Sequence, residues 1–317
     1  MNQRLQKAIA IFLLLLVFLL SACGQKNEQD FLPKVELDSH QIFLFNPFSY
    51  ELGIYDLSTM EWSAIDAQGA FFQAFDWGNN YSYYVVGAQN THDFHLGKAE
   101  KGSLTFYYSQ NNKKQALTPF ATDGKHFLYL IEQVDEKRCL KRIVMISEEG
   151  KITPVANLDG MGVMGGVLID GILYFTCPRQ DSDFYEVWRL ELSEDTGQQK
   201  PVLIRDDYNT FRLYRYRNHL LYIDIENRLL YGEDIKIRMS HSADLVWIDD
   251  EVNLLVEEYV NGNHNLEIVF TDISSGKILG AYEKAINFTR EDSRITIYGS
   301  GFIEYLDLPK GATYGVH

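Results

Sequence analysis

One short pattern recurs along the chain, and its spacing restricts the possible fold more than any other feature. The pattern is a run of alternating apolar residues, a tight polar turn that usually contains Gly or Ser, and a second short apolar run. The clearest copy is Ile268–Leu279, which reads IVFTDISSGKIL. Other good copies occupy residues 52–62, 143–152 and 187–197, and weaker copies occupy 94–102, 229–234 and 303–308. Alternation with a period of two, interrupted by turns, predicts short β-strands.

The spacing of these copies predicts a β-propeller. The leading strands end near residues 56, 97, 147, 192, 232, 272 and 307, so successive copies are 35 to 50 residues apart. A module of about 40 residues with four short strands is typical of a propeller blade, which hides its faces by stacking on neighbouring blades. Long amphipathic helical patterns are missing, which disfavours helical repeats of similar period. We therefore predict an all-β fold, a propeller of seven four-stranded blades, with six or eight blades as alternatives.

The last repeat leaves too little chain for a fourth strand, because only residues 309–317 follow it. We expect the strand-like run Val35–Leu37 to complete the last blade and close the ring.

The turn in the clearest copy resembles the repeat of quinoprotein-type and TolB-type propellers, in which a Thr/Ser-Gly-Lys turn joins the third and fourth strands. Ser275, Gly276 and Lys277 carry this resemblance. It is confined to the turn and includes no ligand-binding residue, so it implies a fold and no activity. The tryptophan periodicity of true quinoproteins is missing, since the chain has four Trp residues.

The first 22 residues have the features of a cleaved export signal. Arg4 and Lys7 precede the run Ala8–Leu20, which contains no polar side chain. A helix needs about 20 apolar residues to cross the hydrocarbon core of a membrane, so this run is too short for a comfortable span. A basic start, a short apolar run and an exit of small residues are typical of a secretory signal peptide.

The exit Leu20-Ser21-Ala22-Cys23 resembles the lipobox of bacterial lipoproteins. The resemblance implies that the Cys23 thiol receives a diacylglyceryl group and that a peptidase cuts the Ala22–Cys23 bond. Two acyl chains hold a protein stably on a membrane, where one chain binds only marginally. The alternative is an uncleaved amino-terminal anchor helix with an incidental cysteine.

These features divide the chain into a signal peptide (1–22), a polar tether that begins at the lipidated Cys23 (23–33) and a propeller (34–317). We expect the protein on the cell membrane, facing the extracellular or periplasmic side.

Loss of the two basic residues of the signal leaves 27 Lys and Arg against 44 Asp and Glu, a net charge of −17. Because an acidic surface repels phosphate backbones, nucleic acid is excluded as a partner. The lipid, and not charge, must hold the protein at the membrane.

Two further cysteines, Cys139 and Cys177, lie in runs that read as neighbouring strands. In an exported protein they either form a disulfide or remain buried thiols.

Several motifs suggest chemistry, but each has a stronger structural interpretation. His92, Asp93 and His95 have metal-ligand spacing, yet they read as a polar strand start with exposed imidazoles. Asp181–Asp183 and Asp206–Asp207 read as solvated turns, because the calcium-loop pattern is missing. The run Gly160–Gly166 lacks the phosphate-binding spacing and a following helix, so we expect a crowded loop that enters an inner strand near the propeller axis. We therefore predict no catalytic, cofactor or metal residue.

The leading hypothesis is a non-catalytic, membrane-tethered module that binds or scaffolds an envelope or extracellular protein. One alternative is a receptor for glycans or small ligands. It would use aromatic platforms in apparent loops, for which the candidates are Phe48, Tyr50, Trp77, Tyr208 and Tyr259. A less favoured alternative is an envelope hydrolase or lyase whose site collects side chains from several blades. The placement of five histidines discriminates this alternative: His92, His126, His219, His241 and His264.

Overall fold

The structure is a computed structural model that describes thirteen stretches of the chain. They are residues 35–46, 51–65, 70–75, 83–89, 93–100, 102–111, 115–123, 126–135, 138–147, 149–180, 182–192, 200–243 and 245–309. All of them belong to one compact unit, Val35–His317. Every element of regular secondary structure in these stretches is a β-strand. Accordingly, the described residues include no helix long and apolar enough to span a membrane.

The strands form seven separate antiparallel sheets, which we number in chain order. The first sheet contains β1 (Gln41–Asn46), β2 (Glu51–Asp56) and β3 (Glu61–Ala64). The second contains β4 (Ala70–Phe75), β5 (Tyr83–Gln89), β6 (Asp93–Glu100) and β7 (Ser103–Asn111). The third contains β8 (Gln115–Thr122), β9 (Phe127–Asp135), β10 (Arg138–Ile146) and β11 (Ile152–Asn157). The fourth contains β12 (Gly166–Ile169), β13 (Ile172–Pro178), β14 (Tyr185–Glu191) and β15 (Val202–Tyr208).

The fifth sheet contains β16 (Leu213–Tyr216), β17 (His219–Asp224), β18 (Leu229–Tyr231) and β19 (Lys236–Arg238). The sixth contains β20 (Leu245–Asp249), β21 (Leu254–Val260), β22 (Leu266–Asp272) and β23 (Ile278–Glu283). The seventh contains β24 (Ala285–Glu291), β25 (Arg294–Gly299) and β26 (Phe302–Asp307).

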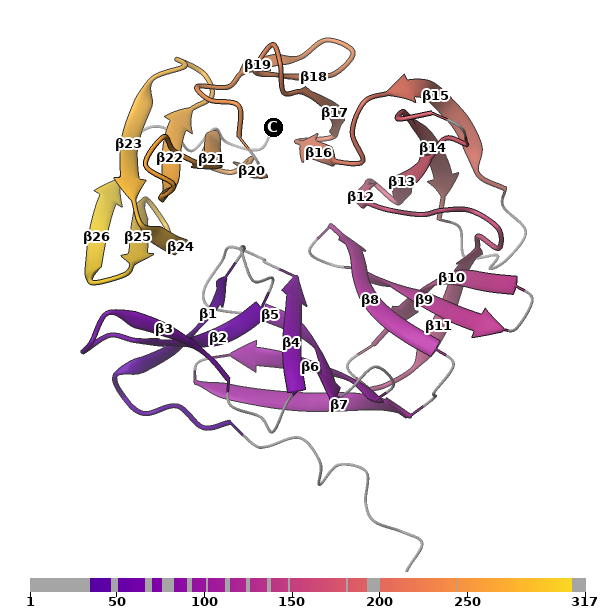
Figure 1. Cartoon of the computed structure of the whole chain (residues 1–317), viewed down its shortest axis with the longest axis horizontal. Helices are drawn as coiled ribbons and strands as arrows, with labels where there is room; N and C mark the ends of the chain where they lie inside the picture. The colour runs from indigo at the N-terminus through magenta and orange to yellow at the C-terminus, as the bar shows by residue number, and fades with distance from the viewer. Residues whose placement is uncertain are drawn as a thin grey trace, which may run out of the picture. The chain divides into compact units, whose positions relative to one another are not determined.

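The sheets are arranged around a common centre, so the β-propeller prediction is confirmed (Figure 1). Within each sheet the strands pair in chain order, and the first strand is the innermost. Neighbouring first strands contact one another, as β8 does with β4 and β12, and β16 does with β12 and β20. The seventh sheet packs back on the first through β24 and β1. The chain therefore closes a ring of small sheets.

The spacing of the sequence repeats located these sheets correctly. Each of the seven predicted strand ends falls within a strand, or one residue beyond it, and each of these strands belongs to a different sheet. The turn of the clearest copy joins β22 and β23, which are the third and fourth strands of their sheet, as the resemblance implied. The prediction that every blade has four strands is wrong, because the first and seventh sheets have three each.

The predicted mode of ring closure is also wrong. Residues Val35–Leu37 do not pair with the seventh sheet: Glu36 forms an antiparallel bridge with Ser103, and the Leu37 amide donates to the Gly102 carbonyl at 3.2 Å. A tight turn precedes β1, in which the Gln41 amide donates to the Asp38 carbonyl at 2.9 Å. This turn reverses the chain and directs the segment before it to the free side of β7. The amino-terminal segment therefore extends the second sheet.

Side chains, and not a shared strand, join the first and seventh sheets. The Tyr55 hydroxyl lies 2.7 Å from the Gly299 carbonyl oxygen and 3.0 Å from that of Phe302. Its ring packs edge-on against the Tyr298 ring, with 5.2 Å between the centroids. The Asn287 amide donates to the Phe45 carbonyl at 2.5 Å. Burial of this aromatic and polar contact closes the ring without a fourth strand in either sheet.

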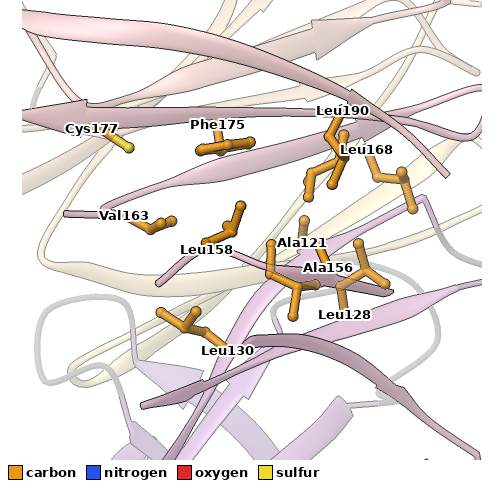
Figure 2. Packing of buried hydrophobic residues seen from close by; sticks show 12 residues of the cluster. Ala121, Leu128, Leu130, Ala156, Leu158, Val163, Leu168, Phe175, Cys177 and Leu190 are labelled. Carbon is orange, nitrogen blue, oxygen red and sulfur yellow. The ribbon is translucent and has the colours of Figure 1, made fainter. Parts of the chain in front are cut away.

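Apolar side chains fill the space between consecutive sheets. Figure 2 shows the cluster between the third and fourth sheets, where Leu128 and Leu130 of β9 approach Leu168 of β12, Phe175 of β13 and Leu190 of β14. Leu128 and Leu130 share one face of β9 because side chains two residues apart in a strand point the same way. A single sheet cannot cover this face, so the alternating pattern requires a neighbouring sheet.

Candidate functional site

The residues assigned to membrane anchoring lie outside the described residues. Cys23 and the tether that follows it precede Val35, where the described part begins. The structure therefore leaves the lipidation prediction as a prediction.

Of the two alternatives for the cysteines, the structure shows the buried thiol at Cys177, which is free. Cys177 lies in β13 of the fourth sheet, whereas Cys139 lies in β10 of the third sheet. Burial, reinforced by the nearby Glu186 carboxylate, raises the pKa of the Cys177 thiol to about 12. The thiol is therefore neutral and acts as a small apolar side chain.

The histidines do not converge in the described part of the chain. His126 lies in the turn between β8 and β9, and His219 begins β17. His241 lies between β19 and β20, and His264 lies in the turn between β21 and β22. His92 lies outside the described residues. Among the described side chains, no three His, Cys, Asp or Glu residues form a group that could hold a metal ion.

The expected exposed imidazole at His95 is wrong. His95 is a buried residue of β6, and its ring meets the Phe106 ring of β7 at 6.2 Å between centroids. Successive side chains of a strand point to opposite faces of the sheet, and His95 points to the covered face of the second sheet.

Two predicted aromatic platforms are strand residues and not loop residues. Tyr208 ends β15 and is almost fully buried. Tyr259 belongs to β21, and one face of its ring is covered by the His241 ring, which is stacked on it at 4.1 Å. Tyr208 therefore has no free ring face on which a sugar could stack, and one ring face of Tyr259 is already occupied, so these two residues do not support the glycan hypothesis as predicted. Its other candidates, Phe48, Tyr50 and Trp77, lie outside the described residues.

The glycine-rich run behaves as predicted and leads into the innermost strand of the fourth sheet. A Cβ atom on Gly166 would lie 2.8 Å from the Phe120 ring of β8, and one on Gly165 would lie 2.9 Å from the Phe211 carbonyl oxygen. Both distances are too short for a real side chain. Gly165 therefore allows a neighbouring backbone, and Gly166 an aromatic ring, to pack closely beside the axis, and no phosphate-binding role is needed to explain them.

The feature that most resembles an interaction site is the outer strand of the fourth sheet, β15. We call residues Lys200–Asp207 the β15 edge. Three consecutive large apolar residues of this strand are exposed: Val202 by 60%, Leu203 by 43% and Ile204 by 42%. Among the described residues, β15 pairs only with β14, so its other side is free. Figure 1 shows β15 on the outside of the ring.

The other outer strands do not combine these properties. β19 exposes Lys236 and Arg238, charged residues of the kind that protect a strand edge from pairing. Ile152 of β11 and Ile278 of β23 are single exposed apolar residues. The second sheet has its outer strand β7 bridged by the amino-terminal segment at Ser103. β3 exposes no large apolar residue, and β26 exposes only Tyr305 among its large apolar residues. Among the outer strands that the structure describes, a row of three exposed large apolar side chains on an unpaired strand therefore occurs at β15 alone, and such edges bind other chains.

Arg205 fastens this strand to the neighbouring sheet. The centre of its guanidinium lies 4.9 Å from the centroid of the Tyr222 ring and 5.8 Å from that of Tyr231. It also donates to the Tyr231 hydroxyl at 3.0 Å and to the Asp207 carboxylate at 2.7 Å. Cation–π contacts and charged hydrogen bonds hold the middle of β15 in place. The exposed residues before Arg205 therefore project from a fixed support.

A second aromatic anchor ends the strand. The Tyr208 hydroxyl donates to the Arg212 carbonyl and accepts from the Ile223 amide at 3.0 Å. Burial raises the pKa of this phenol, so it stays protonated and can donate. Asp206 and Asp207 are exposed to solvent as predicted, but they lie in β15 beside Arg179 and Arg205, so the prediction that they form a turn is wrong. The pairing of β14 with β15 shifts register on both sides of Val187, so β15 carries extra residues here and its side chains do not alternate regularly.

A buried charged residue of the sixth sheet, Glu257, has a structural role. Glu257 is fully buried, and its two carboxylate oxygens accept the backbone amides of Ser240 at 3.0 Å and His241 at 2.8 Å. These bonds tie the connection before β20 to β21. Glu257 therefore supports packing between the fifth and sixth sheets.

No protein-family model matches the chain, and no curated protein matches it by sequence. The chain is similar to the solved structure of TolB from Acinetobacter baumannii, with 12% identity and a TM-score of 0.38 over 81% of this chain and 75% of TolB. It is also similar to prolyl oligopeptidase B from Galerina marginata, with 13% identity and a TM-score of 0.48 over 89% of this chain and 49% of that protein. A third similar structure is the β-propeller domain of the Trilobed protease from Pyrococcus furiosus, with 13% identity and a TM-score of 0.25 over 62% of this chain and 58% of that one. Likeness at this level says nothing about activity.

Proposed function

We propose that the protein is an exported, lipid-anchored β-propeller that acts as a non-catalytic binding or scaffold module at the cell envelope. It engages another polypeptide through the β15 edge. The observation that carries this proposal is the run Val202–Ile204, three exposed apolar side chains on a strand whose outer edge has no partner among the described residues. An unpaired strand offers backbone donors and acceptors for affinity, and its side chains supply selectivity.

The test of this contact is photocrosslinking from single positions in intact membranes. A photoreactive amino acid at Leu203 is expected to give a discrete adduct with a polypeptide. The same amino acid at Lys236, on the outer strand β19, is the matched control and is expected to give none. Equal labelling from both positions, or no adduct from Leu203, would contradict the proposed binding surface.

The proposed anchor depends on Cys23, whose surroundings support it: a basic start, a short apolar run and the lipobox-like exit. Cys23→Ser is expected to move the protein from the membrane fraction to the soluble fraction or to leave an unprocessed precursor. Cys177→Ser, which removes a buried thiol elsewhere, is expected to leave the membrane fraction unchanged. If the Cys23 variant is processed and stays on the membrane as the wild type does, the lipid anchor is wrong.

A further inference from the structure

We infer that one end of the ring rests on the membrane, namely the end at which the third strand of each sheet turns into the fourth. We call the starts of the fourth strands β11, β15, β19 and β23 the tethered rim. This inference rests on the proposed function, because it requires the lipid on Cys23. It identifies the part of the propeller that the phospholipid surface contacts.

The strand order places the whole tethered rim at one end of the ring. Successive strands of an antiparallel sheet run in opposite directions, so the turn between the third and fourth strands lies at the opposite end from the turn between the second and third. Short connections of three to eight residues lead from each fourth strand of the second to fifth sheets into the next first strand. The four-stranded sheets therefore all run the same way around the axis.

The amino-terminal segment leaves the fold at this same end. Glu36 bridges Ser103, the first residue of β7, and the Leu37 amide donates to the Gly102 carbonyl. Gly102 lies in the turn between β6 and β7, the third and fourth strands of the second sheet. Val35, from which the chain continues to Cys23, therefore lies at the end that carries the tethered rim.

The length of the connection to Cys23 favours this end over the opposite one. Residues 24–34 reach at most about 40 Å when fully extended. To bring the opposite end to the bilayer, they would have to run along β7, whose nine residues span about 30 Å. This path uses most of their reach and costs conformational entropy. The tether therefore brings the bilayer to the rim.

The side chains of the tethered rim suit a phospholipid surface. A lysine stands within two residues of each strand start, and all four are exposed: Lys151, Lys200, Lys236 and Lys277. Ile152, exposed by 41%, directly follows the first of these lysines, and Ile278, exposed by 48%, directly follows the last. A lysine can extend its ammonium group to a phosphate while the neighbouring aliphatic side chain enters the headgroup region.

Acidic residues restrict the role of these lysines to orientation. Glu149, Glu233 and Asp234 are exposed in the same turns, and the mature chain has a net charge of −17. Charge therefore does not draw the whole protein to an anionic bilayer. The lipid does so, and the lysines act within about 8 Å of the surface, the distance over which salt screens charges under physiological conditions.

The opposite end also exposes apolar side chains, but carboxylates stand directly beside them. Phe184, exposed by 46%, follows the exposed Asp183 in the turn between β13 and β14. Ile225, in the turn between β17 and β18, precedes the exposed Glu226. A carboxylate next to the apolar side chain opposes contact with phosphate groups. We therefore expect this end to face away from the bilayer.

Quenching by labelled lipids tests the orientation. The full-length lipidated protein with Cys139→Ser receives one of three cysteines, Ile152→Cys, Ile278→Cys or Phe184→Cys, and a fluorescent thiol label. It is reconstituted in vesicles of phosphatidylcholine and phosphatidylglycerol that contain headgroup nitroxides. We expect emission to fall about twofold or more from positions 152 and 278, which contact headgroups, and to stay unchanged from position 184. Cys177 stays unlabelled because its thiol is buried.

Charge reversal tests the contribution of the lysines. Lys277→Glu is expected to reduce the quenching at Ile278→Cys by about half, because it replaces an attraction to anionic headgroups with a repulsion. Lys284→Glu makes the same change at an exposed lysine between β23 and β24, at the opposite end, and is expected to leave the quenching unchanged. Equal effects of the two reversals would contradict the role of the rim lysines.

The possible outcomes separate this inference from the proposed anchor. Quenching at 184 and not at 152 or 278 overturns the inference, because it places the opposite end on the bilayer. Equal quenching at all three positions overturns it as well, because the propeller then has no fixed orientation. No quenching at any position, in a protein that stays with the vesicles, overturns the inference and leaves the lipid anchor in place. A protein that does not stay with the vesicles overturns both.

Discussion

Tyr55 illustrates how single side chains close this ring. Its hydroxyl contacts two carbonyl oxygens of the seventh sheet, Gly299 and Phe302, while the ring lies fully buried against Tyr298. Burial raises the pKa of this phenol to about 12, so it remains a hydrogen-bond donor throughout the physiological range. Loss of the hydroxyl would leave buried acceptors without this partner.

Tyr55→Phe is therefore expected to destabilise the fold by about 1–3 kcal/mol, the cost of leaving a buried polar group unpaired. Urea unfolding followed by tryptophan fluorescence measures the change. Tyr305→Phe removes a hydroxyl from an exposed tyrosine of the same seventh sheet and is the matched control, with no change in the midpoint expected. Equal midpoints for both variants and the wild type would contradict the assigned role of Tyr55 in closing the ring.

Cys177 gives a pH-dependent prediction at the same scale. Its thiol has a pKa near 12 in the folded chain, above the ordinary value of 9.0, because burial disfavours the thiolate. Below pH 9 both folded and unfolded chains keep the proton, so this group causes no pH dependence. Between pH 9 and about 12 the unfolded chain loses a proton that the folded chain retains, so stability falls as the pH rises.

Thiol labelling at pH 8 checks this description directly. The Cys177→Ser variant lacks this thiol, so labelling that the wild type shows and the variant lacks is assigned to Cys177. We expect iodoacetamide to modify Cys177 in urea and to leave it unmodified in the native protein, with peptide mass spectrometry as the readout. Rapid labelling of native Cys177 would show that the thiol is accessible and that the packing between the third and fourth sheets is wrong.

At the scale of elements, charged turns connect consecutive sheets. Arg290 of β24 is buried and donates to Asp249, the last residue of β20, at 2.5 Å. It also donates to Glu251 in the turn after β20 at 2.5 Å. The sixth and seventh sheets thus share a buried ion pair, whereas the Arg294–Asp307 pair within the seventh sheet is exposed.

Removal of the buried arginine, Arg290, is expected to destabilise the fold far more than removal of the exposed arginine, Arg294. Arg290→Met leaves Asp249 as an uncompensated buried carboxylate and is expected to cost about 3–5 kcal/mol of unfolding free energy. Arg294→Met has the same change in side chain but affects only a solvated pair, so no measurable shift in the urea midpoint is expected. Similar shifts for the two variants would contradict a tight junction between the sixth and seventh sheets.

The strands also show how much of the fold can be predicted from the sequence alone. Each predicted strand end falls in a strand or one residue beyond it, because period-two alternation between turn residues is a local signal. The number of strands in the terminal sheets was not predictable in this way, since it depends on where Glu36 finds a partner. The sequence suggests loops at Asp206, Asp207 and Tyr208, whereas the backbone places all three in β15, which pairs with β14.

The candidate site was missed for a similar reason. The run Val202–Ile204 reads as a fully buried strand, because three consecutive apolar residues give no alternation. Its exposure follows from the position of β15 as the last strand of its sheet, which is a property of the tertiary arrangement. A useful signal was available in the neighbouring residues, since Lys200 and Asp206 bracket the apolar run with opposite charges.

In the whole molecule, a closed ring requires the first and seventh sheets to be neighbours, and β1 contacts β24. The Gly301 amide donates to the Met60 carbonyl at 2.9 Å, so the turn before β3 touches the turn before β26. Residues at the two ends of the folded chain are brought together without a shared strand. A linear array of the same sheets would leave these turns far apart.

The most direct measurement joins exposed positions in these two turns with a short bismaleimide crosslinker. A chain carrying Thr59→Cys and Ser300→Cys is expected to form an intramolecular crosslink in high yield, detected as a linked peptide pair by mass spectrometry. A chain carrying Thr59→Cys and Ser182→Cys, the latter in the fourth sheet, is the control and is expected to form none. High yield in the first chain alone is the result that the closed ring predicts, and equal or absent yield in both chains would contradict it.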